Sequence, residues 1–366
     1  MERLVISGAF LLVVVFGIWS GAALADNGLA VDRNAAQRFA TLPEGVRFPE
    51  GITADPGSGD VFVGTFDAPP NNRPNKLLRF DRNGRLEAAR DFANTPLLGL
   101  EFDRANRKVY IAAVGDFSGT GSRIQRIAAN FNGATAIEEV AVIPAIGAPA
   151  PRTVQNPDGS VDTITFGDNA RVPNALTFDA SGNLFISDSF QGAIFRIDNP
   201  NACAPGCAVT TVVQDPLLAT AGFPPFGANG LAFSEDGSAL FIANTGDDRI
   251  LKLELATNLI TVFAESINGA DGIAFDRRGR LWVAANQADE VVGLNASGRV
   301  VAKLGDFQGI RNDGTARGLL FPASVVILGD HLFVTNLALP LNGVAGDEPE
   351  ENVTRYTLSR IRLPHH

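Results

Sequence analysis

One stretch of the chain, residues 227–294, contains the same pattern twice. The first copy, residues 227–253, reads GANGLAFSEDGSALFIANTGDDRILKL, and the second, residues 269–294, reads GADGIAFDRRGRLWVAANQADEVVGL. Each copy has a short polar head, an apolar strand, a polar turn with glycine, a second apolar strand, a polar break and a third strand. Short antiparallel strands that recur in this way are typical of the blades of a β-propeller.

The pattern recurs along the rest of the chain, at residues 48–66, 97–117, 171–198 and, more loosely, 319–339. No long apolar stripe with a period of 3.6 residues competes with it. We therefore predict an all-β fold, a single six-bladed β-propeller with antiparallel blades, over residues 41–366. A strand near residues 38–42 is expected to complete the last blade and close the ring, which protects the sheet edges. Residues 141–171 are expected to form a surface hairpin.

The first 40 residues are predicted to contain a targeting signal followed by a linker. Residues 4–19 are an apolar run, and Ala23-Leu24-Ala25 is a small-x-small cleavage motif. Residues 1–25 are therefore predicted to be a secretory signal peptide, cut after Ala25, with residues 26–40 as the linker. The expected location is periplasmic or secreted, with no membrane attachment after cleavage. The alternative is an uncleaved anchor, since the run is near the lower limit for a membrane span.

Composition and cysteine usage narrow the class of partner. The formal net charge is −10, which argues against a nucleic-acid partner. We expect a monomer. The two cysteines, Cys203 and Cys207, lie in the motif CAPGC and are predicted to form a local disulfide in an exported protein. A metal-binding or redox role for this pair is the weaker alternative, because no histidine lies nearby.

Strand geometry places the polar heads of the blades together. A first strand starts, and the antiparallel second strand ends, on the same face of the disc. Glu50, Asn174, Asn229 and Asp271 hold the head position and should converge on one mouth of the central channel. In the second blade this position is assigned to Gly99, which offers no ligand.

Carboxylate and amide oxygens are the ligands that Ca²⁺ prefers, whereas Zn²⁺ would favour His or Cys. The heads therefore predict a site for Ca²⁺ or another divalent cation. The alternative is that the Asn-Gly and Asp-Gly pairs only shape turns, or that the polar ring hydrates the channel.

These motifs resemble the senescence marker protein (regucalcin)/gluconolactonase family, and more distantly the paraoxonases and strictosidine-synthase-like proteins. The resemblance covers residues 48–362, and its carriers are Pro49-Glu50-Gly51, Pro173-Asn174, Ala228-Asn229-Gly230 and Ala270-Asp271-Gly272. It implies a six-bladed propeller with one divalent cation in the channel. It further implies that Glu50, Asn174, Asn229 and Asp271 hold the ion, and that Asp271 also serves as the catalytic base.

The resemblance also points to residues that bind a substrate. In the gluconolactonase branch an arginine near the middle-blade asparagine binds the substrate, and Arg171 occupies a similar place here with a different spacing. Asp188, Asn244 and Asn286 end second strands on the same face and are expected to orient the substrate. The paraoxonase histidine pair has no counterpart, because His331 falls in a turn on the opposite face and His365 and His366 lie at the tail.

The leading hypothesis is metal-assisted hydrolysis of a lactone or related ester, with Asp271 or a metal-bound hydroxide as the base. A serine hydrolase is disfavoured, because no Gly-x-Ser-x-Gly elbow with a histidine partner is present. The alternatives are a non-enzymatic propeller that binds a ligand or protein around a structural Ca²⁺, and a lyase or synthase on the same scaffold. The loops that shape the mouth contain no motif that names a substrate.

Overall fold

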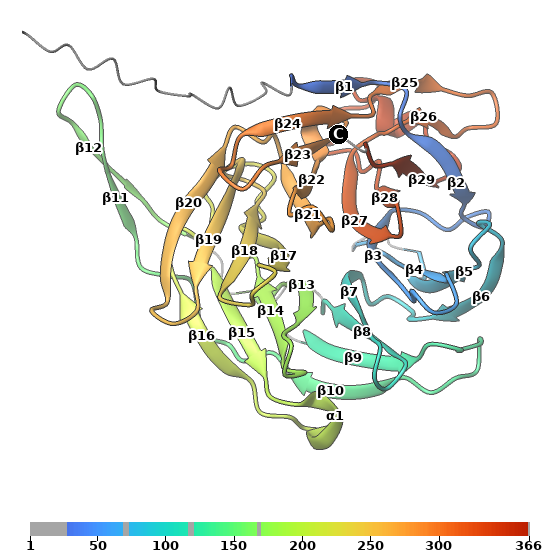
Figure 1. Ribbon diagram of the computed structural model, residues 1–366, viewed down its shortest axis with the longest axis horizontal. Helices are drawn as coiled ribbons and strands as arrows, with labels where there is room; N and C mark the ends of the chain where they lie inside the picture. Colours follow the sequence, from blue (N-terminus) through green and yellow to red (C-terminus); the bar gives the residue numbers. More distant parts are fainter. Residues whose placement is uncertain (1–27, 69–72, 116–120, 167–169, 365–366) are drawn as a thin grey trace, which may run out of the picture.

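A computed structural model describes residues 28–68, 73–115, 121–166 and 170–364. It confirms the six-bladed β-propeller, with six sheets arranged radially around a central channel (Figure 1). The predicted signal peptide, residues 1–25, lies outside the described residues, as do His365 and His366. Among the described residues, no helix has the length and apolar character needed to cross a membrane.

Each blade is a sheet whose strands follow one another outward in chain order, except for the outermost strands of blades five and six. Blade one has β3 (Pro49–Ala54), β4 (Val61–Thr65), β5 (Lys76–Phe80) and β6 (Leu86–Asp91). Blade two has β7 (Leu97–Asp103), β8 (Lys108–Ala113), β9 (Arg123–Ala128) and β10 (Glu138–Val142). Blade three has β13 (Pro173–Phe178), β14 (Leu184–Asp188), β15 (Ala193–Ile197) and β16 (Thr210–Gln214). Blade four has β17 (Ala228–Phe233), β18 (Ala239–Asn244), β19 (Arg249–Glu254) and β20 (Leu259–Glu265).

The last two blades recruit strands from the start of the chain. Blade five has β21 (Ala270–Phe275), β22 (Leu281–Ala285), β23 (Glu290–Leu294) and β24 (Val300–Leu304), with β1 (Ala30–Asp32) added in parallel to β24. Blade six has β27 (Pro322–Leu328), β28 (His331–Asn336) and β29 (Thr357–Arg362), and β2 (Gln37–Thr41) pairs antiparallel with β29. This pairing confirms the predicted closure of the ring. The β1 strand was not predicted, because its residues were assigned to the linker.

Short elements connect the blades. The predicted surface hairpin is present as β11 (Arg152–Gln155) and β12 (Val161–Ile164), which projects from the disc (Figure 1). A second hairpin, β25 (Phe307–Ile310) and β26 (Ala316–Gly318), precedes blade six. One short helix, α1 (Pro200–Cys203), and two 3₁₀ turns, Asn286–Ala288 and Pro349–Asn352, are the described helical elements. The chain is thus nearly all strand.

The turns between first and second strands follow from their sequence. In blade three the Asp179 carboxylate accepts the backbone N–H of Ser181 (2.9 Å) and of Asn183 (2.8 Å), which folds the chain back. Gly182 follows with φ +82°, a left-handed conformation that glycine adopts without strain. Blade five repeats the arrangement with Asp276 and Gly279 (φ +74°). The Asp-x-x-Gly motif therefore forms the turns on the face of the disc opposite the heads.

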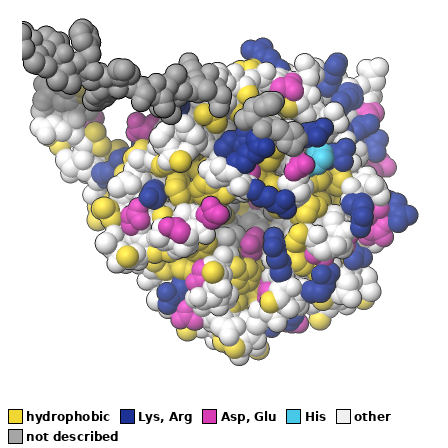
Figure 2. Space-filling model, in the orientation of Figure 1, with side chains coloured by type: hydrophobic (Ala, Val, Ile, Leu, Met, Phe, Trp, Pro, Cys, Tyr) yellow, Lys and Arg dark blue, Asp and Glu magenta, His cyan; other side chains and the backbone are white. Residues whose placement is uncertain are grey.

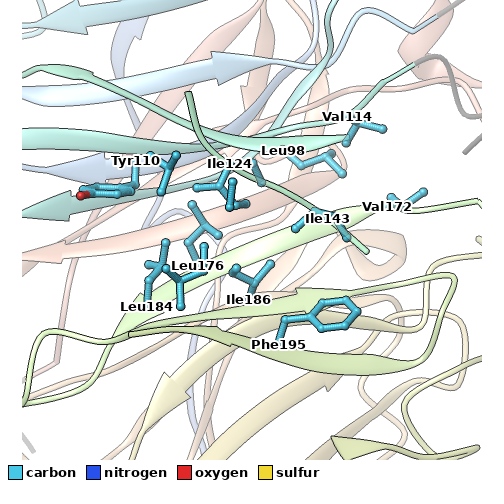
Figure 3. Close-up of a cluster of buried hydrophobic side chains, with 14 of the residues drawn as sticks. Leu98, Tyr110, Val114, Ile124, Ile143, Val172, Leu176, Leu184, Ile186 and Phe195 are labelled. Carbon is cyan, nitrogen blue, oxygen red and sulfur yellow. The ribbon is translucent and has the colours of Figure 1, made fainter. Parts of the chain in front are cut away.

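The hydrophobic core lies between neighbouring blades and not in one central mass, because each sheet is apolar on both faces. Figure 3 shows the cluster between blades two and three, where Leu98, Tyr110 and Ile124 face Leu176, Ile186 and Phe195. The strand β14 is buried along its whole length, as are β4 and β18. Each blade therefore buries its apolar faces against the blades beside it.

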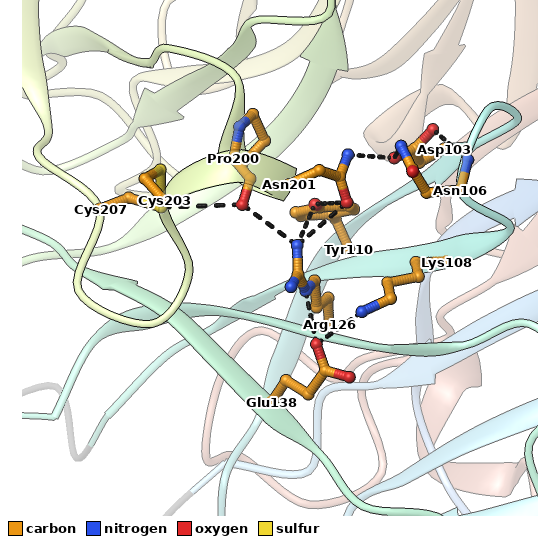
Figure 4. A network of polar contacts seen from close by, with 10 residues as sticks. All are labelled: Asp103, Asn106, Lys108, Tyr110, Arg126, Glu138, Pro200, Asn201, Cys203 and Cys207. Atoms are coloured by element: carbon orange, nitrogen blue, oxygen red, sulfur yellow. Dashed lines mark hydrogen bonds and ion pairs between the residues drawn. A yellow bond between two sulfur atoms is a disulfide. The ribbon is translucent and has the colours of Figure 1, made fainter.

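The CAPGC motif lies at the outer edge of blade three, where Cys203 and Cys207 form the predicted disulfide (Figure 4). A buried arginine joins this turn to blade two. Arg126 Nη1 donates to Pro200 O (3.1 Å) and to Asn201 Oδ1 (3.0 Å), while its Nε donates to Glu138 (2.7 Å). The position of α1 is therefore fixed by a charged hydrogen-bond network as well as by the disulfide.

Candidate metal and substrate site

The head residue of each blade is the second residue of its innermost strand. Every innermost strand shifts register against its neighbour across the head and the residue after it, for example between Ala270 and Ile273 in blade five. Such a bulge redirects a side chain out of the normal alternation. The six positions are Glu50, Leu98, Asn174, Asn229, Asp271 and Ala323. The head of blade two is therefore Leu98 and not Gly99, so the predicted assignment was one residue too far along.

The glycine after the head allows neighbouring blades to approach each other. A Cβ on Gly230 would collide with the carbonyl oxygen of Asp271 in the next blade, and a Cβ on Gly51 would collide with that of Leu98. At Gly272 a Cβ would lie 2.6 Å from Ser324 Cα. The Asn-Gly and Asp-Gly pairs thus lie inside strands, where glycine gives space for close packing rather than shaping a turn.

Hydroxyl groups at the ends of second strands hold the heads in place. Asn174 Nδ2 donates to Ser189 Oγ (3.0 Å), which donates to the backbone oxygen of Ala228 in the next blade (2.8 Å). In the same way, Asn229 Nδ2 donates to Thr245 Oγ1 (3.0 Å), and this hydroxyl donates to Ala270 O (2.8 Å). Each amide nitrogen thus donates a hydrogen bond to a hydroxyl group of its own blade, which orients the side chain.

Two further hydroxyls complete this set of interblade links. Ser187 Oγ donates to Asn229 O (2.8 Å), and Thr335 Oγ1 donates to Glu50 O (2.8 Å). Sequence reasoning missed all four hydroxyl residues. The signal available was their place in the repeat, since Ser187, Ser189, Thr245 and Thr335 all lie where a second strand ends.

The four predicted heads meet at one cavity of about 40 Å³ at the centre of the disc. Glu50 and Asp271 are only 4% and 5% exposed. The cavity is lined by Glu50, Phe66, Leu98, Asn174, Pro224, Phe226, Asn229, Thr245, Asp271, Asn286, Phe321, Leu337, Leu339 and Leu341. The predicted convergence of the heads therefore occurs, within a lining that is otherwise largely apolar.

The two carboxylates carry buried acceptor atoms that no described residue satisfies, Glu50 Oε2 and Asp271 Oδ1. Burial raises the pKa of Asp271 to about 7, although hydrogen bonds from Asn286 and Asn229 oppose the shift. Burial also raises the pKa of Glu50, and the neighbouring charge of Asp271 raises it further. Two adjacent buried anions are unstable unless a proton or a cation compensates them.

The donor set fits a hard divalent cation. The side chains of Glu50, Asn174, Asn229 and Asp271 can present oxygen atoms from four different blades, and Ca²⁺ takes six to eight such ligands with water. The described residues place no histidine or cysteine at the cavity, which would be expected for Zn²⁺.

Of the four predicted substrate-binding residues, one lines the cavity and three do not. Asn286 lines the cavity and donates from Nδ2 to Asp271 Oδ2 (3.1 Å). Arg171, Asp188 and Asn244 are not among the lining residues. Arg171 donates to Ile143 O (2.9 Å), and Asn244 donates to Leu217 O (2.9 Å) and Ala219 O (3.0 Å).

The Asp188 carboxylate serves a turn beside the cavity. It accepts the backbone N–H of Phe190 (3.2 Å) and of Gln191 (3.0 Å), together with Gln191 Nε2 (3.0 Å). Like Asn244, it is fully buried. Asp188 and Asn244 therefore end second strands on the predicted face, but their polar atoms make hydrogen bonds to neighbouring loops.

The opposite mouth of the channel is a wider funnel of about 240 Å³. Glu101 lines it beside Thr53 and Thr177, with apolar residues such as Leu100 and Ile273 below. Burial raises the pKa of Glu101 to about 8. Figure 2 shows one face of the disc, hollowed near its centre, with both basic and acidic side chains around the hollow. This visible surface therefore lacks the uniform positive charge of a nucleic-acid interface.

Comparison with known proteins supports the resemblance drawn from the motifs. Residues 224–305 match the family model described as SMP-30/Gluconolactonase/LRE-like region. The matched residues contain the heads Asn229 and Asp271. The resemblance to this family is thus confirmed for that part of the chain. No curated protein matches the chain.

Solved structures share the fold over most of the chain. A luciferin-regenerating enzyme is 13% identical with a TM-score of 0.60, covering 87% of this chain and 92% of its own. Regucalcin of Agrobacterium tumefaciens, a calcium-binding protein, is 16% identical with a TM-score of 0.57, covering 92% of this chain and 97% of its own. Virginiamycin B lyase of Staphylococcus aureus is 14% identical with a TM-score of 0.51, covering 90% and 99%. At these identities the likeness supports the propeller architecture.

Proposed function

We propose that this propeller is a metal-dependent hydrolase of a lactone or related ester, with Ca²⁺ or another divalent cation held by Glu50, Asn174, Asn229 and Asp271. One observation carries the proposal. Two buried carboxylates, Glu50 and Asp271, lie at one cavity with the side chains of Asn174 and Asn229, and Glu50 Oε2 has no described hydrogen-bond partner. The match of residues 224–305 to the gluconolactonase-like family model supports the reaction class.

A bound divalent cation would polarise the scissile carbonyl and stabilise the charge that develops on its oxygen. The protein would supply the base. Asp271 Oδ2 accepts a hydrogen bond from Asn286, which fixes the carboxylate, while Oδ1 has no described partner. Oδ1 can therefore take a proton from water as the water oxygen bonds to the carbonyl carbon. When the ring C–O bond breaks, the departing oxygen regains that proton from Asp271.

The alternative function is a ligand-binding propeller in which the ion is structural. A panel of lactones, tested with and without a chelator, separates the two possibilities. Turnover that the chelator abolishes and Ca²⁺ restores supports hydrolysis. Metal binding by calorimetry without turnover of any lactone or ester would favour the alternative.

We also propose export, which rests on residues 4–25 and on the Cys203–Cys207 disulfide, since disulfides persist in oxidising compartments. The N-terminus of the processed protein should be Asp26. Recovery of the intact N-terminus from the cytoplasmic fraction alone would contradict this proposal.

A further inference from the structure

The apolar lining of the cavity restricts which substrates can bind there favourably. Apart from the four heads, Thr245 and Asn286, the described lining residues are hydrocarbon or aromatic: Phe66, Leu98, Pro224, Phe226, Phe321, Leu337, Leu339 and Leu341. A substrate with a hydroxyl on every ring carbon would lose water at these surfaces and find few partners there. Buried hydroxyls without partners are unfavourable, whereas hydrocarbon is stabilised by the same contacts.

Two loops that are well anchored provide much of this lining. In residues 222–226, the oxygen of Phe226 accepts the N–H of Gly246 (2.9 Å), and its ring lies between Phe66 (centroids 6.4 Å apart) and Phe190 (5.6 Å). In residues 337–341, the N–H of Leu341 donates to Glu348 Oε2 (2.8 Å). The apolar surface therefore belongs to the folded structure.

The apolar surface also extends from the buried carboxylates toward the solvent. Phe66, Leu98, Phe321 and Leu337 are buried around the carboxylates, whereas Phe226, Leu339 and Leu341 are partly exposed. A cavity of about 40 Å³ accommodates the reacting carbonyl group but not an alkyl chain. The body of a substrate would accordingly lie along the partly exposed side chains.

We propose that this site selects lactones or esters with an extended hydrocarbon chain and discriminates against sugar lactones. The proposal rests on the hydrolysis proposed above. The position of Arg171 agrees with it, because this cationic side chain is bonded to Ile143 O and does not line the cavity. The described lining thus offers no cationic group for the hydroxyls of a sugar.

The test compares alkyl-substituted δ-lactones from δ-hexalactone to δ-dodecalactone with glucono-δ-lactone, all in the presence of Ca²⁺. We expect kcat/KM to rise by about two- to fourfold per methylene until the chain reaches solvent. Glucono-δ-lactone should be poorer than the best alkyl lactone by about 100-fold or more.

A pair of variants links the preference to the lining. Leu341→Gln places an amide on the proposed path and should flatten the dependence on chain length. Val344→Gln is the matched control, because Val344 is 63% exposed in the same segment and does not line the cavity. Binding of cyclooctanone, a ketone that cannot be hydrolysed, is measured in parallel by calorimetry and should weaken in Leu341→Gln only.

The outcomes separate this inference from the hydrolysis on which it rests. Fastest turnover of glucono-δ-lactone would overturn the apolar preference while leaving the hydrolysis intact. Binding of cyclooctanone that depends on Leu341, with no turnover of any lactone, would refute the hydrolysis and support the apolar site. Absence of both binding and chain-length dependence would overturn the inference.

Discussion

At the scale of single residues, Asp271 combines two roles that its two oxygens could divide. Oδ2 is held by Asn286, and Oδ1 faces no described donor. A carboxylate that binds a cation is normally a weak base, so the proposed catalytic role depends on the oxygen that has no described partner. The two roles can be tested separately, because an amide retains an oxygen ligand but not the charge or the basicity.

We predict that Asp271→Asn and Asp271→Ala both lower kcat by about 100-fold or more, because each removes the base. Asp271→Asn should retain more Ca²⁺ affinity than Asp271→Ala. Kinetics on a responsive lactone and calorimetry with Ca²⁺ measure the two effects. Asp236→Asn, an exposed change in the turn of blade four, is the control. Wild-type turnover in Asp271→Asn would show that the base lies elsewhere.

Glu101 gives a prediction for pH. Its folded pKa is about 8, above the ordinary glutamate value of about 4.5, so the folded state holds its proton where the unfolded chain has lost it. The associated stability is fully present below pH 4.5 and is lost as the pH rises through 8. Glu101→Gln should therefore melt higher than the wild type at pH 8 and equally at pH 4.

The comparison is made by thermal melts from pH 4 to pH 9. Glu265→Gln, at an exposed glutamate, should show no such trend. A constant difference in melting temperature between Glu101→Gln and the wild type would contradict the assignment.

At the scale of elements, the innermost strands combine site and packing in three consecutive residues. The head points into the cavity because of the bulge, and the following glycine lets the next blade approach. The hydroxyl of a neighbouring second strand then fixes the backbone of the head, as Ser187 does for Asn229. Packing and ligand placement are therefore coupled within each strand.

We predict that Gly230→Ala destabilises the fold by about 1–3 kcal/mol, because its Cβ would meet the carbonyl oxygen of Asp271. Displacement of this backbone should also weaken Ca²⁺ binding. Urea unfolding and calorimetry provide the measurements. Gly343→Ala is the control, since no atom lies within 4 Å of its added Cβ. Unchanged stability in Gly230→Ala would mean that the blades can separate without cost.

The repeat in the sequence was sufficient to predict the strands and the convergence of four heads, because strand direction alone decides which ends share a face. The head of blade two was misassigned although the repeat could have given it, because Leu98-Gly99 aligns with Glu50-Gly51 and Asp271-Gly272. The repeat could not orient Arg171, whose direction depends on the carbonyl of Ile143, 28 residues away. Contacts between distant segments decided what the local pattern left open.

At the scale of the whole molecule, the ring is closed by contacts between innermost strands of successive blades, and β27 contacts β3 to complete the circle. The outer closure depends on β2, which covers the edge of β29 (Figure 1). Uncovered strand edges are templates for pairing with other chains.

We predict that deletion of residues 1–41 gives an aggregating protein, because it removes β1 and β2 and exposes two edges. Deletion of residues 1–28 should leave a monomer with wild-type melting behaviour, since both strands remain. Size-exclusion chromatography and thermal melts compare the two forms. A monomeric, cooperatively folded protein lacking residues 1–41 would show that closure by β2 is dispensable.

The sharing of one sheet by the first and last parts of the chain also has a consequence for biosynthesis. β2 is among the earliest described segments to be made, yet its partner β29 ends at Arg362. Blade six therefore cannot form before residues 357–362 have been synthesised, and β2 remains without its partner while the first five blades emerge. Early blades can fold as they appear, but the last step joins segments more than 300 residues apart, which is entropically slow. The synthesis of β29, rather than local strand formation, should therefore determine when the native ring appears.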